Sequence, residues 1–478
     1  MRKRHALLSV FAIAASVFVV PATAHAAGET VQIWLTTTDG DGGRNVTRGL
    51  EQQEPVTFTP GTGAGQQTIT VDEGTTYQEF EGGGASFTDS AGWLLNSSGL
   101  LSSADRDAVL QKLFDPEQGI GLSFLRNPMG GADLSRSSYT YDDMPAGQTE
   151  PGLDHFSIEH DQADVLPLTQ QAKKLNPQIK VMASPWSAPP WMKDNDDYKL
   201  GWVQSQYYDA YAQYFVKYVQ AYQDAGVPID YVSIQNEPTC CDSYPSTNWD
   251  GSGLAYFAKN NLLPALQKAN LSTKLLALDW NWDQYQSFGA PTMDDEAIRT
   301  HPNFGGMAWH GYGGDVGQQS TVHDQYPDVN AYSTEHSGGE WVSDQQSDDM
   351  ADIVNYTRNW SRSVVKWSMA MDENHNPHNG GCDNCTGLVT VNSGGGQVDY
   401  TIEYYTMGHL TKFVKPGAVR IDSNDNDTVR NVAWKNPDGS KALIAYNTGT
   451  SEQSVRVNSG DESFTYALPA HTSATFTW

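Results

Sequence analysis

From about residue 79 to 414 the chain alternates short apolar runs with longer amphipathic segments. Each run ends in glycine, proline, tryptophan or polar residues, as strands do where they leave a buried sheet. The segments between them, such as 102–114, 206–226, 252–270 and 347–363, carry apolar residues at helical spacing and are expected to be helices. The eight runs are 79–86, 122–131, 179–186, 229–238, 273–282, 304–314, 330–339 and 364–374.

Eight strand-then-helix units in about 330 residues predict an α/β fold, a closed (β/α)8 barrel of the TIM type. The structural alternative is an open, doubly wound sheet, which typically has a glycine-rich phosphate-binding loop after its first strand. The segment EGGGAS (81–86) resembles such a loop only weakly, because it lacks the G-x-G-x-x-G spacing. We therefore expect the barrel.

The two ends of the chain follow a different pattern. Residues 27–78 and 416–478 are rich in Thr, Val, Gly and Ser, and their apolar and polar positions alternate, which predicts strands. The segment TVRNVAWKNPDGSKALIAYN indicates a hairpin with PDGS as its turn. We interpret both ends as one β-sandwich packed on a barrel that occupies residues 79–415.

Residues 1–26 are typical of a secretory signal peptide. Charged residues at 2–5 precede an apolar stretch at 6–20, and PATAHAA offers an A-x-A cleavage site ending at Ala26. The alternative is a buried N-terminal helix. Since no other stretch approaches 18 uninterrupted apolar residues, we expect a secreted, extracellular protein without stable membrane association.

The charge balance limits the classes of partner. The sequence has 57 acidic and 29 basic residues, a formal net charge of −28. Such a surface repels nucleic acid and anionic lipid and suits neutral substrates. Nothing in the sequence implies a cofactor, a metal ion or a partner protein, so we expect a monomer.

Four cysteines, Cys240, Cys241, Cys382 and Cys385, are expected to form disulfides in an exported protein, and three connectivities are open. A zinc site is the alternative. The adjacent pair is poorly spaced for zinc, and the CDNC segment has no matching second C-x2-C.

Two of the predicted strand ends carry glutamates. Active residues of a (β/α)8 barrel stand at the carboxyl ends of its strands. Asn236 and Glu237 end the fourth run, Pro238 stops strand pairing there, and Glu335 ends the seventh run. Taken alone, Asn-Glu-Pro is more typical of a loop start with a solvated acid. Together, two glutamates at one barrel mouth match acetal cleavage, in which one carboxyl protonates the leaving oxygen and the other attacks the anomeric carbon.

Six segments in order along the chain strengthen this hypothesis: EGGGASFTDSAGWLL, LRNPMGGADLSRSSYTYDD, MASPWSAPPWMKDN, SIQNEP, YSTEHSGG and YYTMGHLTKFVKPGAVRI. Together they resemble glycoside hydrolase family 30, the glucosylceramidase-like retaining β-glycosidases. The resemblance implies that Glu237 is the acid/base and Glu335 the nucleophile. It implies that Asn236 binds the sugar 2-hydroxyl and that further residues line the sugar subsite, namely Asp133, Trp186, Asn195, His310, Tyr312 and Trp367.

Structural roles are the alternatives for several of these residues. Asp133 is also compatible with a helix cap or an ion pair at the barrel rim. His310 is also compatible with a rim histidine that contacts no sugar. Trp186 and Trp367 are compatible with packing at the top of the barrel.

The substrate is predicted from the loops beside the site. Segments 238–253 and 372–387, after the fourth and eighth strands, are polar and glycine-rich, which suits a hydroxyl-rich glycan better than a lipid tail. They look more like the β-1,6-glucanase branch of the family, so we expect an endo-β-1,6-glucanase. The alternatives are a glucosylceramidase, then a β-1,6-galactanase or xylanase. A different class, a non-catalytic glycan-binding protein, is disfavoured because both glutamates are present.

Overall fold

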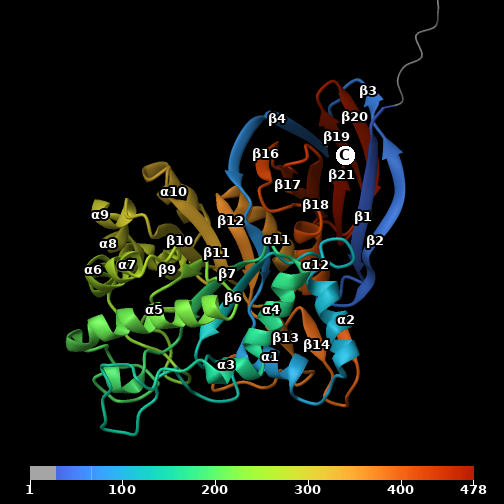
Figure 1. Cartoon of the computed structure of the whole chain (residues 1–478). Helices are drawn as coiled ribbons and strands as arrows, with labels where there is room; N and C mark the ends of the chain where they lie inside the picture. The colour runs from blue at the N-terminus through green and yellow to red at the C-terminus, as the bar shows by residue number, and fades with distance from the viewer. Residues whose placement is uncertain (1–27, 66) are drawn as a thin grey trace, which may run out of the picture.

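The computed structural model describes residues 28–65 and 67–478, which form a barrel and a β-rich unit beside it (Figure 1). The expected signal peptide, residues 1–26, lies outside the described residues. No helix within the described ranges is both long and apolar enough to span a bilayer.

Eight parallel strands close into the barrel that the alternating pattern predicts. Strands that follow one another in the sequence are neighbours in the barrel, and the last strand pairs with the first. The strands are β5 (Gly82–Ala85), β6 (Phe124–Met129), β7 (Lys180–Pro185), β8 (Tyr231–Val232), β9 (Lys274–Asn281), β10 (Phe304–His310), β11 (Asn330–Glu335) and β12 (Ser361–Lys366).

The inside of the barrel is filled by side chains. Strands β6 to β12 each contribute one residue to a separate buried cluster, as expected of a layer inside a barrel. The remaining strand, β5, contributes glycines, and a Cβ at Gly84 would lie 1.9 Å from the carbonyl oxygen of Phe124. Because the interior is a packed core, a ligand can bind only outside it, and the mouth at the carboxyl ends of the strands is the expected place. The cluster consists of Phe124, Met182, Tyr231, Leu276, Ala308, Tyr332 and Val365.

Helices surround the barrel. Ser102 caps α2 by accepting a hydrogen bond from the backbone N–H of Asp105, and α5 buries tyrosines at helical spacing, including Tyr211, Tyr214 and Tyr218. The helices are α1 (Asp89–Asn96), α2 (Ser103–Phe114), α3 (Glu159–Ala163), α4 (Val165–Leu175), α5 (Tyr208–Asp224), α6 (Gly251–Phe257), α7 (Leu263–Lys268), α8 (Ala290–Met293), α9 (Glu296–Arg299), α10 (Gly317–Gln325), α11 (Gln345–Arg358) and α12 (Ile402–Thr411).

Several element bounds differ from the sequence prediction. The segment expected to be one helix at 252–270 contains a π-helical turn, Ala258–Leu262, between α6 and α7. The eighth strand ends at Lys366, and the apolar pair Ala370–Met371 forms β13 in a separate small sheet with β14 (Val389–Val391) and β15 (Val398–Tyr400). The apolar run at 364–374 therefore spans two sheets, which hydrophobicity alone does not distinguish.

The two chain ends build one sheet of ten strands, in the order β2-β1-β21-β18-β17-β16-β4-β19-β20-β3. Strands from the start of the chain, drawn in blue, lie beside strands from its end, drawn in red (Figure 1). This confirms the predicted β-sandwich with strands from both termini. The strands are β1 (Thr30–Thr38), β2 (Val46–Thr57), β3 (Thr59–Pro60), β4 (Thr68–Glu79), β16 (Val419–Ser423), β17 (Val429–Lys435), β18 (Lys441–Asn447), β19 (Gln453–Ser459), β20 (Glu462–Leu468) and β21 (Thr472–Thr477).

Helix α12 joins the barrel to this sheet through a buried histidine. His409 is fully buried, and its ring nitrogens lie 2.9 Å from the hydroxyls of Thr475 and of Thr36. The Thr475 hydroxyl donates to the carbonyl of His409, so it accepts from Nδ1. This pattern fits a neutral ring, and burial lowers the pKa of His409 to about 3.

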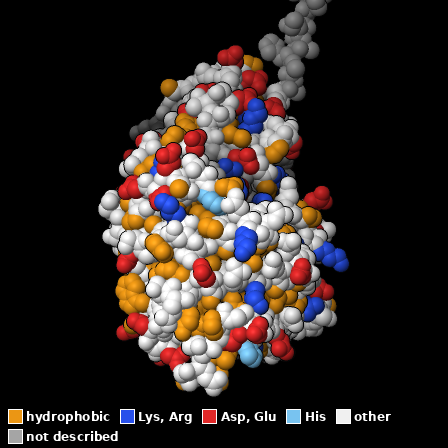
Figure 2. Space-filling model, turned by 60° about the vertical axis from the view of Figure 1, so that its left-hand side comes forward, with side chains coloured by type: hydrophobic (Ala, Val, Ile, Leu, Met, Phe, Trp, Pro, Cys, Tyr) orange, Lys and Arg blue, Asp and Glu red, His pale blue; other side chains and the backbone are white. Residues whose placement is uncertain are grey.

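The outer surface carries charges of both signs. Figure 2 shows acidic and basic side chains scattered singly over one face, among larger areas of uncharged polar and apolar surface.

Candidate active site

Two glutamates from different strands come together at the mouth of the barrel. Glu335 is the last residue of β11, and Glu237 lies in the turn that follows β8. One carboxylate oxygen of each, together with a ring nitrogen of His310, lie within 4.8 Å of one another. Two carboxyl groups at this separation can act on the same bond of a ligand.

The turn after β8 sets the position of Glu237. The β8 ladder covers only Tyr231–Val232, so the predicted strand is shorter than 229–238, although the residues up to Asn236 stay buried. Glu237 has φ 41°, and its N–H donates to the carbonyl of Asp279 at 3.0 Å. Non-glycine residues at positive φ are uncommon, and they gather at functional sites.

Arg126, on β6, connects three polar groups of the site. Its guanidinium is fully buried and donates to Glu335 Oε2 at 2.6 Å, to Asn236 Oδ1 at 2.7 Å and to Asp279 Oδ2 at 2.8 Å. A buried arginine needs such partners because removing its charge from water is costly. Its planar fork fixes the carboxylate of Glu335 and the amide of Asn236 relative to each other.

Asp279, at the end of β9, is the anionic counterpart of Arg126. It also accepts hydrogen bonds from hydroxyls on three neighbouring strand ends: Ser184, Ser233 and Thr334 at 2.7, 2.6 and 2.9 Å. Burial alone would raise its pKa, but the charge of Arg126 and the hydrogen bond from His310 hold the pKa of Asp279 well below its usual range. Asp279 is therefore a fixed negative charge beneath the site.

His310 bridges Asp279 and Glu237. Its Nε2 lies 3.1 Å from Asp279 Oδ1, and its Nδ1 lies 2.8 Å from Glu237 Oε1. Burial opposes the charged ring, but the charge of Glu335 and the hydrogen bonds to Asp279 and Glu237 raise the pKa of His310 to about 9. At neutral pH the ring is an imidazolium that donates to Asp279 Oδ1 and to Glu237 Oε1.

Glu335 is held by Tyr312 as well as by Arg126. The Tyr312 hydroxyl donates to Glu335 Oε1 at 3.0 Å and lies 3.0 Å from the hydroxyl of Ser337. Tyr312 is 42% exposed as a residue, while its hydroxyl lies within the site beside Glu335. Burial raises the pKa of Glu335, whereas the charges of His310 and Arg126 act in the opposite direction.

A tryptophan pair forms one wall beside Arg126. Trp186 and Trp367 are stacked with ring centroids 4.9 Å apart, and the Arg126 guanidinium lies 5.0 Å from the Trp186 ring. The Trp367 indole donates to Asp133 Oδ2 at 3.3 Å. Burial and then the charge of Glu335 raise the pKa of Asp133 to about 7. Oδ1 of Asp133 is buried and has no hydrogen-bond partner within the described residues, so the carboxyl keeps capacity for a ligand hydroxyl.

Asn195 does not lie with this group. It is exposed on the loop after β7, and its amide donates to the carbonyl of Lys199 at 2.8 Å. The structure thus brings together every site residue proposed from the sequence except Asn195.

The four cysteines form two short-range disulfides, Cys240–Cys241 and Cys382–Cys385. Of the three connectivities left open, this is the one that keeps each pair within a single loop.

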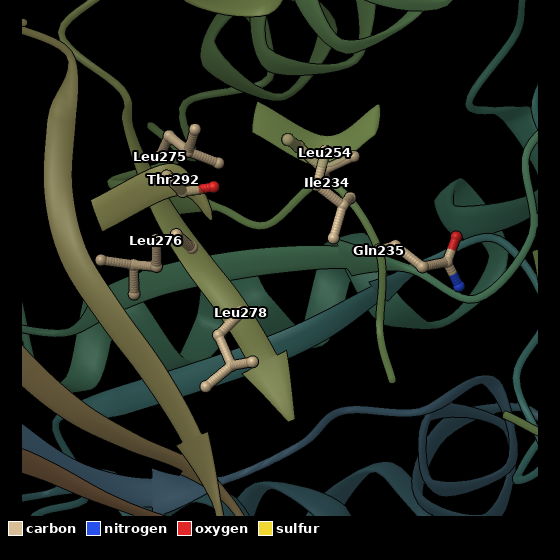
Figure 3. A pocket seen from close by; sticks show the side chains of 8 residues that line it. Ile234, Gln235, Leu254, Leu275, Leu276, Leu278 and Thr292 are labelled. Atoms are coloured by element: carbon tan, nitrogen blue, oxygen red, sulfur yellow. The ribbon is translucent and has the colours of Figure 1, made fainter. Parts of the chain in front are cut away.

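A small apolar cavity lies behind the fourth strand, away from the glutamates. It measures about 10 Å³, and its lining includes Ile234, Gln235, Leu254, Leu276 and Thr292 (Figure 3). A space of this size holds about one water molecule. It is a gap in the packing of the barrel wall and cannot accept a sugar.

Arg126 and Asp279 belong to the site but were not among the residues proposed from the sequence. Asp279 stands near the carboxyl end of its strand, which was the available signal, whereas Arg126 lies in the middle of β6. Their side chains lie beneath the mouth, fully buried, and the sequence pattern does not show that they face each other.

Comparison with known families agrees with this geometry. Residues 80–414 match the family described as the glycosyl hydrolase family 30 TIM-barrel domain. Residues 417–476 match the glycosyl hydrolase family 30 beta sandwich domain.

Individual relatives include an endo-1,6-β-D-glucanase of Trichoderma harzianum, 33% identical over 78% of this chain and 78% of that protein. A putative glucosylceramidase of Caenorhabditis elegans is 30% identical over 80% of this chain and 76% of that protein. A solved structure of an endo-β1,6-glucanase, 30% identical, superposes with a TM-score of 0.84 over 94% of this chain and 98% of the other.

Proposed function

Since the chain belongs to glycosyl hydrolase family 30 and is a glycosidase, we propose that it is an endo-β-1,6-glucanase that retains anomeric configuration. Three relatives named as endo-1,6-β-glucanases, at 32–33% identity, support the substrate. The loops after β8 and β12 support it independently, because they offer polar and glycine-rich surface where a lipid substrate would need an apolar one.

The separation of the glutamates carries the mechanism. Retaining glycosidases place their two carboxyl groups about 5–5.5 Å apart, whereas inverting enzymes leave about 6.5–9.5 Å for a water molecule. One carboxylate oxygen of Glu237 and one of Glu335 lie within 4.8 Å of each other, which favours double displacement.

In the first step Glu335 attacks the anomeric carbon while Glu237 protonates the leaving oxygen, and a glycosyl ester forms on Glu335. In the second step Glu237 removes a proton from water, which hydrolyses the ester. Arg126 and Tyr312 orient Glu335 through hydrogen bonds of 2.6 and 3.0 Å. Asn236, oriented by Arg126 at 2.7 Å, is placed to bind the sugar 2-hydroxyl, a contact that strengthens in the transition state.

We also propose that the protein is exported and acts outside the cell as a monomer. The proposal rests on the signal-like pattern of residues 1–26. Cleavage after Ala26, read from the N-terminal sequence of protein recovered from the medium, and a monomeric mass in solution are the expected observations.

The test is product analysis on linear β-1,6-glucan, with Glu335→Gln as the matched control. We expect gentio-oligosaccharides early in the time course, with the β-anomer appearing first by NMR, and a loss of rate by several orders of magnitude in the variant. Initial α-anomer would contradict retention. Cleavage of glucosylceramide but not of the glucan would replace the substrate and leave the two glutamates in their roles.

A further inference from the structure

The disulfide between the adjacent residues Cys240 and Cys241 lies beside the proposed acid/base. Its two sulfurs and a carboxylate oxygen of Glu237 lie within 4.8 Å of one another. The group formed by Glu237, His310 and Glu335 shares only Glu237 with this one. Both cysteines are partly exposed, and their sulfur pair lies beside Glu237 and outside the hydrophobic core.

The loop holds this sulfur pair in a fixed position. Thr239 and Cys241 have φ values of 69° and 71°, in the left-handed region that non-glycine residues rarely adopt. The Thr239 hydroxyl donates to the carbonyl of Trp249 at 2.6 Å, and the Ser246 hydroxyl donates to the carbonyl of Cys241 at 2.6 Å. The backbone N–H of Cys240 returns to the carbonyl of Glu237 at 3.0 Å. The disulfide and Glu237 are therefore parts of one rigid turn.

Tyr244 contacts the disulfide through its hydroxyl. Its hydroxyl lies 2.7 Å from Cys241 Sγ. The loop after β12 approaches the ring of Tyr244 closely, because a Cβ added at Gly381 would lie 2.5 Å from Tyr244 Cδ1. The two disulfide-bearing loops thus meet at this tyrosine.

We propose that the Cys240–Cys241 disulfide is the platform on which the departing sugar rests. This inference depends on the proposed function, in which Glu237 protonates the leaving oxygen. The sugar that stays attached is bound at Glu335, and the leaving sugar lies beyond Glu237. The disulfide flanks Glu237 and is not in the cluster with Glu335, so it faces the leaving sugar. Sulfur is polarizable and makes favourable contacts with apolar surface such as the C–H face of a pyranose. Because the turn is rigid, this contact costs little ordering on binding.

The test compares Cys240→Ser/Cys241→Ser with the wild type on two substrates. Gentio-oligosaccharides have a leaving sugar, whereas β-glucosyl fluoride has none and needs no proton from Glu237. We expect kcat/KM on the oligosaccharides to fall about tenfold, equivalent to about 1.4 kcal/mol, while kcat/KM on the fluoride is nearly unchanged. Cys382→Ser/Cys385→Ser is the matched control, since it removes a disulfide and should keep the wild-type ratio of the two rates.

Equal losses on both substrates, or no loss on either, would overturn the platform. Reducing the disulfide chemically tests the same contact in a protein that has already folded. In the Cys382→Ser/Cys385→Ser protein, Cys240–Cys241 is the only disulfide that the four cysteines leave, so a mild reductant should lower the ratio and reoxidation should restore it. A ratio that reduction leaves unchanged contradicts the proposal.

A third readout separates this inference from the proposed substrate. The enzyme is trapped as its 2-deoxy-2-fluoroglucosyl ester, and reactivation is followed with and without an acceptor glucoside. The acceptor should accelerate reactivation of the wild type much more than of Cys240→Ser/Cys241→Ser, whatever linkage the enzyme prefers. Equal acceleration overturns the platform. Failure of the wild type on β-1,6-glucan, with normal trapping, removes only the proposed substrate.

Discussion

His310 is the residue whose charge state connects the two sides of the site. With a pKa of about 9, it is cationic at neutral pH and donates to both Glu237 and Asp279. The folded pKa lies above the unfolded value of about 6.5, so the stabilisation is complete below about pH 6.5 and is lost as the pH rises through about 9.

We therefore predict that the ring of His310 stays protonated up to about pH 8 and titrates near pH 9, with a parallel fall in kcat/KM. The measurement is ring-nitrogen NMR of the histidines, with the signal assigned by its absence in His310→Gln. A neutral His310 ring at pH 7 would show that Asp279 and Glu237 do not hold the proton there.

At this scale the sequence pointed to the side chains at the mouth of the barrel and not to the buried side chains beneath them. Glu237, Glu335 and Asn236 could be found because they end apolar runs that a barrel brings to one mouth. Arg126 lies in the middle of its apolar run, its three partners come from three other strand ends, and no local pattern shows which side chains meet below the rim. Asn195 lies apart from this group on an exposed loop, and a motif match carries no information on where such a loop points its side chain.

Among the elements, the strand starts were more predictable than the strand ends. In the sequence pattern a strand is taken to end where the apolar run ends. In the structure it ends where its regular backbone pairing with the neighbouring strands ends. After β8 the residues up to Asn236 remain buried outside the regular ladder, and single backbone hydrogen bonds to the neighbouring strands, such as that from the Glu237 N–H to the carbonyl of Asp279, fix the turn at Glu237. The bounds of α6, α7 and β12 shifted because a π-helical turn and a second sheet use the same apolar residues that a single helix or strand would use.

Helix α12 provides the prediction at the scale of an element. The folded protein keeps His409 neutral down to about pH 3, whereas the unfolded chain takes up a proton below about pH 6.5. This share of stability is present above about pH 6.5 and is lost as the pH falls toward 3, by about 1.4 kcal/mol per pH unit. Glutamine can keep a donor and an acceptor at this position without titrating.

We expect the free energy of unfolding of the wild type to fall more steeply between pH 6 and 4 than that of His409→Gln. Urea unfolding at several pH values measures both slopes. The readout is the difference between the two slopes of unfolding free energy against pH. A loss of stability that is equal at all pH values does not change this difference. Parallel slopes would mean that the contacts with Thr36 and Thr475 do not exclude the proton.

On the scale of the whole molecule, the sheet makes the two chain ends depend on each other. β1 pairs with β21, and β4 lies between β16 and β19. Removing residues 416–478 would leave β1 and β4 without these partners and would expose the apolar residues they share, including Ile33 and Ile69.

We predict that a chain of residues 27–415 does not give soluble, active monomer, because the lost strands cover one of its two large cores. Yield of soluble protein, elution volume and β-glucosyl fluoride turnover are the measurements, and the chain of residues 27–478 is the control. A monomeric 27–415 with full activity would show that the barrel needs no partner for the strands at its N-terminal end.

The pairing of the first strand with the last also sets a time order. The hydroxyls of Thr37 and Thr472 lie 3.0 Å apart although 435 residues separate them. At a synthesis rate of about 5–20 residues per second, β1 waits on the order of half a minute or more for its neighbour to be made. During that interval its unpaired edge can join another chain. The sheet can therefore be completed only after the end of the chain has been synthesised. We expect chaperones that shield early strands to affect the yield of this protein more than its final stability.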